Sequence, residues 1–416
     1  MASETSATTS TQFVDTDVTD TLKRVRLVVE VYVVGTLCAL GIAGNLLSIV
    51  VLGRDHTIRR TTGFLLQMLA VADVVYLVAC VFYQTMNCIE QQTDWLPAFV
   101  QRRWPYIEVY AWPAASVAQT ATVWMVVVLT ADRYIAICRP LHAAQYSTVS
   151  RVRKAVAGVW IFAVVYNLPR FFERVVVVMS ANFTSLTVTT SSLDLLSKAT
   201  FPGTTAAVDS QRVVMQWTAM RESAVYVLLY KTCSFFVVRF LIPFATLAFV
   251  NQRLIRAMRE SSRLREQATG GFGSGSSGGQ KERQHTRILV VVVVVFVFCE
   301  LPDLVLRAWM ALHQNAPNHV AFPRAQLLYV NVASNLLLTV NSCINFVIYC
   351  LMGRRFRTIL LRTLGCVSQM PPTSSVRSFQ LRTLLKSSSC FCCSLALAAH
   401  IILAHIMRHY WLVRHP

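Results

Sequence analysis

The sequence predicts an all-α membrane protein, a bundle of seven transmembrane helices followed by a short amphipathic helix. Of the 416 residues, 55% are hydrophobic and only 14% are charged, whereas about a quarter of the residues in a soluble domain carry charge. The apolar residues gather in seven runs, each long enough for the ~20 residues that cross a bilayer. Lipid offers the backbone no hydrogen bonds, so such runs form helices.

The seven predicted spans and their flanking segments divide the whole chain. The spans are Leu27–Leu52, Thr62–Met86, Pro105–Cys138, Lys154–Phe172, Ala224–Ile255, Thr286–Leu312 and Ala325–Leu351. Residues 1–26 are expected to form an extracellular tail, 27–352 the transmembrane domain, 353–365 the amphipathic juxtamembrane helix and 366–416 a cytoplasmic tail. Glycine and serine dominate an inner loop at about 268–280, which predicts a flexible linker.

Loop charges predict how the chain sits in the membrane. Basic residues concentrate in alternate loops and in the C-terminal tail, so the net charge of +19 does not require a nucleic-acid partner. The positive-inside rule places the N-terminus outside and the C-terminus in the cytoplasm. The sequon Asn182-Phe183-Thr184 then lies in the second outer loop, where glycosylation can occur. We expect a multi-pass glycoprotein of the plasma membrane.

Polar residues and prolines recur inside the spans, where ionisable groups are costly and usually functional. In chain order they are Asn45, Asp73, Asp132-Arg133-Tyr134, Trp160, Pro243, Pro302, Asn341, Ser342, Asn345 and Tyr349. Their order and spacing across residues 27–365 resemble those of rhodopsin-like (class A) G-protein-coupled receptors. The segment Asn167-Leu-Pro-Arg-Phe-Phe-Glu173 and the end of the seventh span also resemble the invertebrate FMRFamide-receptor-like neuropeptide receptors.

The resemblance implies a receptor that binds an extracellular peptide, RFamide-like by that resemblance. Binding would open the intracellular face of the receptor and so activate a heterotrimeric G protein. The coupling and switch residues would be Asp132, Arg133, Tyr134, Leu141, Glu282 and Tyr349. In this scheme Arg133 pairs with Glu282 in the inactive state, and Leu141 enters a cleft of the G protein. The alternatives are a solvated Glu282 and ordinary loop packing of Leu141.

A cation site in mid-bundle is a further implication of the resemblance. Its residues would be Asp73, Thr122, Asn341, Ser342 and Asn345. One carboxylate among neutral oxygens suits a small hard cation, and the family implies sodium. Ordered water is the alternative occupant. No other cofactor is expected.

Three departures from the family pattern concern the outer half of the chain and the switch. Glu108 stands where most such receptors have the third-span cysteine of a disulfide, and the second outer loop, about 173–223, has no cysteine, so no such bridge is expected. Glu300 replaces the tryptophan of Cys-Trp-x-Pro. Phe346 replaces the proline of Asn-Pro-x-x-Tyr.

The ligand class follows from what the outer half of the bundle contains. Amine receptors of the resembled family have an aspartate at the position of Ala115, so an amine ligand is disfavoured. Opsins have a lysine at the position of Thr339, so retinal is disfavoured. The expected pocket residues are Tyr83, Gln84, Gln119, Arg239, Glu300, Asp303, Arg307, Asn331 and Asn335. A guanidinium needs a carboxylate partner, so Glu300 or Asp303 is expected to meet an arginine of the peptide. An internal pair with Arg239 is the alternative.

Other classes of function remain open at this point. A seven-helix transporter or channel could use the charged cavity as a path, although transporters usually show repeats or broken helices. A signalling-silent membrane scaffold is the other alternative. No nucleophile triad, phosphate loop or zinc motif indicates an enzyme. The apolar, cysteine-containing stretch near residues 390–412 is expected to lie at the membrane interface or to be acylated. A disordered terminus without a role is the alternative.

Overall fold

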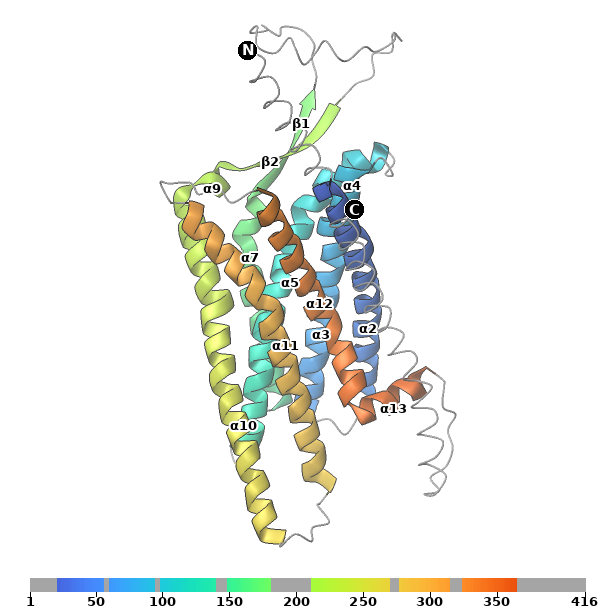
Figure 1. Ribbon diagram of the computed structural model, residues 1–416, viewed down its shortest axis with the longest axis vertical. Coiled ribbons are helices and arrows are strands. Elements are labelled where there is room, and N and C mark those ends of the chain that lie inside the picture. Colours follow the sequence, from blue (N-terminus) through green and yellow to red (C-terminus); the bar gives the residue numbers. More distant parts are fainter. Residues whose placement is uncertain are drawn as a thin grey trace, which may run out of the picture.

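The computed structural model describes residues 21–55, 60–93, 98–139, 148–180, 211–269, 277–314 and 324–364. Long helices run side by side, with a two-stranded hairpin at one end of the bundle and a short helix near the other (Figure 1). We call the end that carries the hairpin the outer end and the opposite end the inner end, following the predicted orientation. The glycosylation residue Asn182 and the predicted coupling residue Leu141 lie outside the described residues.

The first four spans begin and end close to their predicted positions. The first comprises η1 (Leu27–Val33) and α2 (Val34–Arg54), the second α3 (Arg60–Cys80), η2 (Val81–Met86) and α4 (Asn87–Gln92), the third α5 (Ala98–Cys138), and the fourth α7 (Val149–Asn167) and η3 (Leu168–Phe172). The third helix starts earlier than Pro105, since Pro105 and Pro113 both lie inside α5.

The remaining elements begin within the second outer loop. They are the strands β1 (Arg174–Ser180) and β2 (Gln211–Trp217), the short helix α9 (Ala219–Glu222), the fifth span with η4 (Tyr226–Ser234), η5 (Phe236–Leu241) and α10 (Ile242–Thr269), the sixth with α11 (Ser277–Gln314), the seventh with α12 (Arg324–Met352), and α13 (Arg354–Thr363). α13 is the predicted amphipathic helix. Arg357 donates to the carbonyls of Cys350 and Leu351, at 2.6 and 2.7 Å, and so caps the end of α12.

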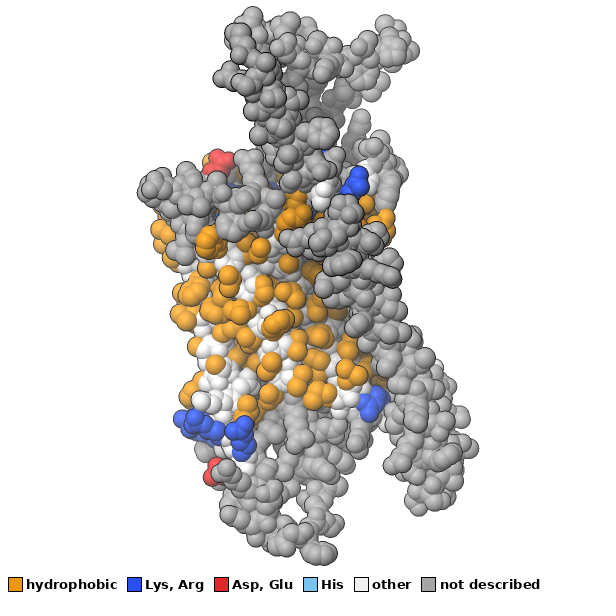
Figure 2. Space-filling view, in the orientation of Figure 1, with side chains coloured by type: hydrophobic (Ala, Val, Ile, Leu, Met, Phe, Trp, Pro, Cys, Tyr) orange, Lys and Arg blue, Asp and Glu red, His pale blue; other side chains and the backbone are white. Residues whose placement is uncertain are grey.

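Six helical stretches among the described residues are long and apolar enough to cross a membrane. They are Thr21–Arg54, Arg60–Gln92, Arg103–Cys138, Val149–Phe172, Tyr226–Ala257 and Leu327–Met352. The predicted span missing from these six is the sixth, α11, whose apolar stretch is interrupted by Glu300, Asp303 and Arg307. Figure 2 shows hydrophobic side chains over the middle of the bundle surface and arginine or lysine side chains toward its ends. This distribution fits a protein surrounded by lipid, and the predicted helical bundle is confirmed.

One element differs from the all-α prediction. β1 and β2 pair antiparallel, with Arg174 opposite Trp217 and Ser180 opposite Gln211. Four consecutive valines, 175–178, occupy β1, and β-branched residues favour strands. The hairpin lies directly above the outer end of the bundle (Figure 1).

Candidate functional site

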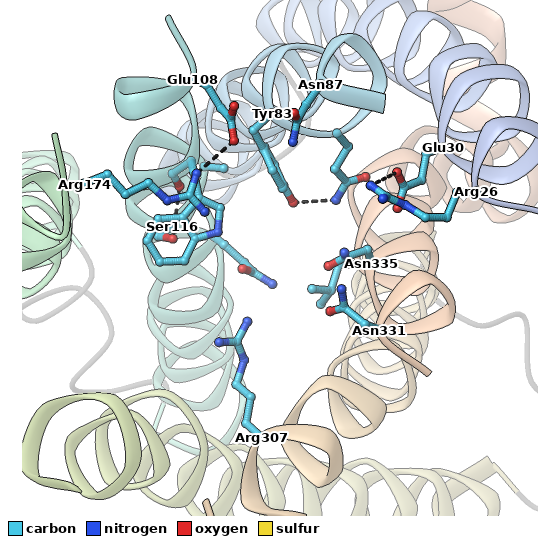
Figure 3. Close-up of a pocket in the computed structure, with 15 residues that line it drawn as sticks. Arg26, Glu30, Tyr83, Asn87, Glu108, Ser116, Arg174, Arg307, Asn331 and Asn335 are labelled. Carbon is cyan, nitrogen blue, oxygen red and sulfur yellow. Dashed lines mark hydrogen bonds and ion pairs between the residues drawn. The ribbon is translucent and has the colours of Figure 1, made fainter. Parts of the chain in front are cut away.

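A cavity of about 290 Å³ lies at the outer end of the bundle. Its walls come from the first, second, third, sixth and seventh spans and from β1 (Figure 3). Six of the nine predicted pocket residues line it: Tyr83, Gln84, Gln119, Arg307, Asn331 and Asn335. These six therefore meet in space although they come from four different spans.

Other residues line the same cavity without having been predicted to do so. They are Arg26, Glu30, Asn87, Glu108, Trp112, Ala115, Ser116, Arg174 and Leu338. The spacing of Arg26 and Glu30, four residues apart, places both on one helix face and was the available sequence signal for that pair. Arg174 follows the fourth span directly, and no periodicity marks it as a cavity residue.

Both carboxylates of the cavity wall form ion pairs with arginines. Arg26 lies 3.2 Å from Glu30, and Arg174 lies 2.9 Å from Glu108. Both glutamate side chains are only 9% exposed, whereas the two arginine side chains are 23% and 15% exposed. Burial lowers the pKa of the Arg174 guanidinium, and the adjacent Glu108 carboxylate opposes that shift. The carboxylates are thus less exposed than the arginines that pair with them.

Arg307 is the most exposed of the charged side chains in this wall. Its Nε donates to Asp303, four residues earlier on α11, at 2.8 Å, and its side chain is 32% exposed. The terminal nitrogens of Arg307 point into the cavity (Figure 3). The most exposed charge on the cavity wall is therefore positive.

The other three predicted pocket residues lie beside the cavity, not on its wall. Arg239 of η5 lies 3.7 Å from Glu300 of α11, and both side chains are buried. Gln119 donates to Glu300 at 3.5 Å. Asp303 is buried and pairs with Arg307. Both acidic residues that were expected to meet a peptide arginine thus have arginine partners within the chain, and the Arg239 pair was the stated alternative.

The predicted cation-site residues converge in mid-bundle. Asp73 is completely buried, Asn345 donates to its carboxylate at 2.8 Å and Thr122 at 3.4 Å. Ser342 also interacts with Asp73 through its side chain. Asn341 is buried on the same helix as Ser342 and Asn345. Most of the donor set that the sequence predicted is therefore assembled around one carboxylate.

The coupling residues lie toward the inner end. Asp132 and Arg133 are both buried and form an ion pair at 2.7 Å, and Arg133 also donates to the hydroxyl of Thr62 on α3. Tyr134 is half-buried on the same helix. Glu282 belongs to the first turns of α11, where the structure describes the backbone alone. Its pairing with Arg133 stays a prediction.

The end of the seventh span shows how a phenylalanine fits where the family usually has proline. α12 continues through Phe346 to Met352 without a break. The Phe346 ring is buried and lies 6.0 Å, between ring centroids, from Phe356 of α13. Tyr349 is buried against the same Phe356 ring at 5.6 Å. Phe346 therefore joins the packing between α12 and α13.

Comparisons with known proteins agree with this architecture. Residues 44–349 match the family model described as 7 transmembrane receptor (rhodopsin family). The chain is 28% identical to an FMRFamide receptor of Drosophila melanogaster over 337 residues, which are 80% of this chain and 54% of that protein. It is 26% identical to an FMRFamide peptide receptor of Caenorhabditis elegans over 356 residues, 84% of this chain and 72% of that protein.

A shorter similarity extends to vertebrate proteins. The human thyrotropin-releasing hormone receptor is 34% identical over 146 residues, which are 35% of this chain and 34% of that protein. The chain spans only about half the length of the Drosophila receptor. The family match, however, covers well over half of this chain and all seven spans except the start of the first and the last residues of the seventh. The protein therefore belongs to the rhodopsin family of seven-transmembrane receptors.

Proposed function

We propose that this protein is a neuropeptide receptor, which binds the end of a peptide in the outer cavity and activates a heterotrimeric G protein at its inner end. The observation that carries the proposal is the polar cavity lined by five spans and by Arg174 of β1. Its volume of about 290 Å³ is near the lower limit of ligand pockets, ~300–1,000 Å³. It suits the terminal residues of a peptide.

The chemistry of the cavity favours an amidated peptide terminus. Arg307 offers donors, and the side-chain amides of Gln119, Asn331 and Asn335 offer both donors and acceptors. A terminal carboxamide has one carbonyl to accept from Arg307 and one NH₂ group to donate to the amide oxygens. Two relatives are named for the peptide FMRFamide, whose name describes such a terminus. We infer an RFamide-like ligand whose terminus, not its arginine, enters this cavity.

The inner end supports coupling to a G protein. Arg133 is held by Asp132 and Thr62 in the present arrangement, facing the bundle interior. Release of a permanently charged guanidinium from such partners is a two-state event of the kind that ligand binding can bias. Glu282 and Leu141 are proposed to add the lock and the G-protein contact that the family implies.

A sodium ion is proposed for the mid-bundle site. Asp73 supplies a buried charge, the hydroxyls of Thr122 and Ser342 interact with it, and the side-chain NH₂ group of Asn345 donates to it. A carboxylate with neutral oxygen ligands fits a hard monovalent cation. When bound, the ion would neutralise Asp73 and hold the second, third and seventh spans together.

Peptide-dependent nucleotide exchange on purified G protein tests the proposal. The receptor is exposed to a library of amidated peptides and to the same peptides as free acids. We expect activation by an amidated member, a strong preference for its amide, and about a tenfold or larger loss of potency in Arg307→Gln, since one charged hydrogen bond is worth that much. Arg103→Gln is the matched control, because Arg103 is exposed on α5 and does not line the cavity.

The outcomes separate the alternatives. Silence toward every peptide, with the receptor correctly folded in the membrane, would overturn the receptor proposal in favour of a silent scaffold. Activation with equal potency losses in Arg307→Gln and Arg103→Gln would keep the receptor but refute the assignment of the cavity to the peptide terminus.

A further inference from the structure

The β1–β2 hairpin contributes Arg174 to the cavity wall, and no cysteine anchors the hairpin there. The sequence contains none between Glu173 and Ser223, and the third span has Glu108 where the resembled receptors have the cysteine that bridges to this loop. The structure places Arg174, the first residue of β1, with its Nη1 atom 2.9 Å from Oε1 of Glu108. An ion pair therefore links the same two segments that a disulfide links in the resembled receptors.

Aromatic rings enclose the arginine of this pair. The Arg174 guanidinium lies 4.4 Å from the ring centroid of Trp217, its partner across the hairpin, and 5.3 Å from that of Trp112 on α5. Cations in this position are attracted to the ring face, more strongly when water is excluded. One side chain thus joins β1 to β2 through Trp217 and joins both strands to α5 through Trp112 and Glu108.

The base of the hairpin is held by a second buried carboxylate. Glu173 precedes β1, is fully buried, accepts a hydrogen bond from the Tyr226 hydroxyl at 2.8 Å and pairs with Arg221 at 3.2 Å. Its carbonyl accepts from the Thr218 amide at 3.0 Å, just after β2. These contacts fix where the hairpin starts, whereas Glu108 and Arg174 fix it against the third span.

We propose that Glu108 and Arg174 are positioning residues that hold the hairpin over the ligand cavity, in the role that a disulfide has in the resembled receptors. Both side chains line the cavity, so the pair sets the position of one of its walls. Because the link is electrostatic, it forms without oxidation and withstands thiol reductants. The proposal concerns the receptor without ligand and does not depend on which peptide binds.

Hydrogen–deuterium exchange of the full-length receptor in lipid nanodiscs, without peptide, tests the anchor. Glu108→Gln is expected to raise exchange of the backbone amides in 174–180 and 211–217 about tenfold, as expected for the loss of one charged hydrogen bond. Glu30→Gln is the matched control: it removes a carboxylate of the same cavity that is equally buried and paired with Arg26, and it should leave exchange in the hairpin unchanged.

Rescue and reduction complete the test. The swapped pair Glu108→Arg with Arg174→Glu should recover most of the protection that Glu108→Gln loses, and dithiothreitol should leave the wild-type hairpin unaffected. Arg174→Lys keeps the charge, so its hairpin amides should exchange at a rate between those of wild type and Glu108→Gln. This variant tests the anchor even if the swapped receptor does not fold. Equal hairpin exchange in wild type and Glu108→Gln, or a rise caused by dithiothreitol in the wild type, would overturn the proposal.

Discussion

The Glu300 carboxylate lies 3.7 Å from the Arg239 guanidinium, and the pair joins α11 to η5 with both side chains buried. Gln119 of α5 donates to the same carboxylate at 3.5 Å. Glu300 stands where the resembled receptors have the tryptophan of their sixth-span motif. Charged and polar side chains from three spans thus meet where the resembled receptors have a tryptophan. Any rearrangement of the sixth span must preserve or break these contacts.

Removing one partner of this pair should destabilise the receptor strongly. A lone buried charge costs about 3–5 kcal/mol, whereas replacing both charges by neutral groups is often close to neutral. Glu300→Gln and Arg239→Gln should therefore each lower the melting temperature of the purified receptor, and the double variant should recover most of the loss. Additive losses in the double variant would show that the two side chains act independently.

Close packing of Gly44 against Phe346 gives a second prediction. A Cβ atom added at Gly44 would lie 3.0 Å from the Phe346 ring, which is tighter than ordinary van der Waals contact. Gly44→Ala should cost about 1–3 kcal/mol of stability through overpacking. Phe346→Leu in the same chain should relieve part of this cost, as measured by thermal unfolding. If the stability loss of the double variant equals the sum of the two single-variant losses, contact with Phe346 does not cause the destabilisation by Gly44→Ala.

Spacing along single spans predicted much of the bundle and of its interior. The ordered set that includes Asp73 and Asn345 identified two residues 272 positions apart that hydrogen-bond at 2.8 Å. Asp303 and Arg307 were expected at the pocket but not as a pair, although their four-residue spacing, which puts them on one face of α11, is a sequence signal for the ion pair. The family resemblance implied the first contact, which joins two spans. The helical period, which decides the face that a residue occupies, is a signal for the second contact alone.

Contacts across spans and loops were less accessible to sequence reasoning. Arg239 was named as an alternative partner of Glu300 or Asp303, and the relative rotation of η5 and α11 decides that it pairs with Glu300. The pairing of Arg174 with Glu108 depends on the path of a loop. The valines of β1 were the one local indication of the hairpin.

Sodium should stabilise the receptor through Asp73. Cation binding to the folded state raises its stability by mass action, so sodium chloride should raise the melting temperature above that in equal potassium chloride. Asp73→Asn removes the charge but keeps the size of the side chain, and it should abolish the difference between the two salts. A sodium effect that persists in Asp73→Asn would place the ion elsewhere.

Neutralising Asp132 should raise activity in the absence of peptide. Asp132 lies 2.7 Å from Arg133 in a buried pair, and Asp132→Asn weakens one of the contacts that hold the guanidinium inward. A loss of about 1.4 kcal/mol from the inactive state would increase the active population about tenfold while that population is small. Basal nucleotide exchange on purified G protein measures this directly.

The matched comparison for Asp132 is Thr62→Val, which removes the hydroxyl that accepts from Arg133 without changing charge. Both variants should raise basal exchange, with the larger effect in Asp132→Asn, because a hydrogen bond between two charged groups is stronger than one to a neutral acceptor. Arg133→Ala combined with either change should abolish basal and peptide-driven exchange alike. Raised exchange that survives the loss of Arg133 would mean that this arginine is not the group whose release activates the receptor.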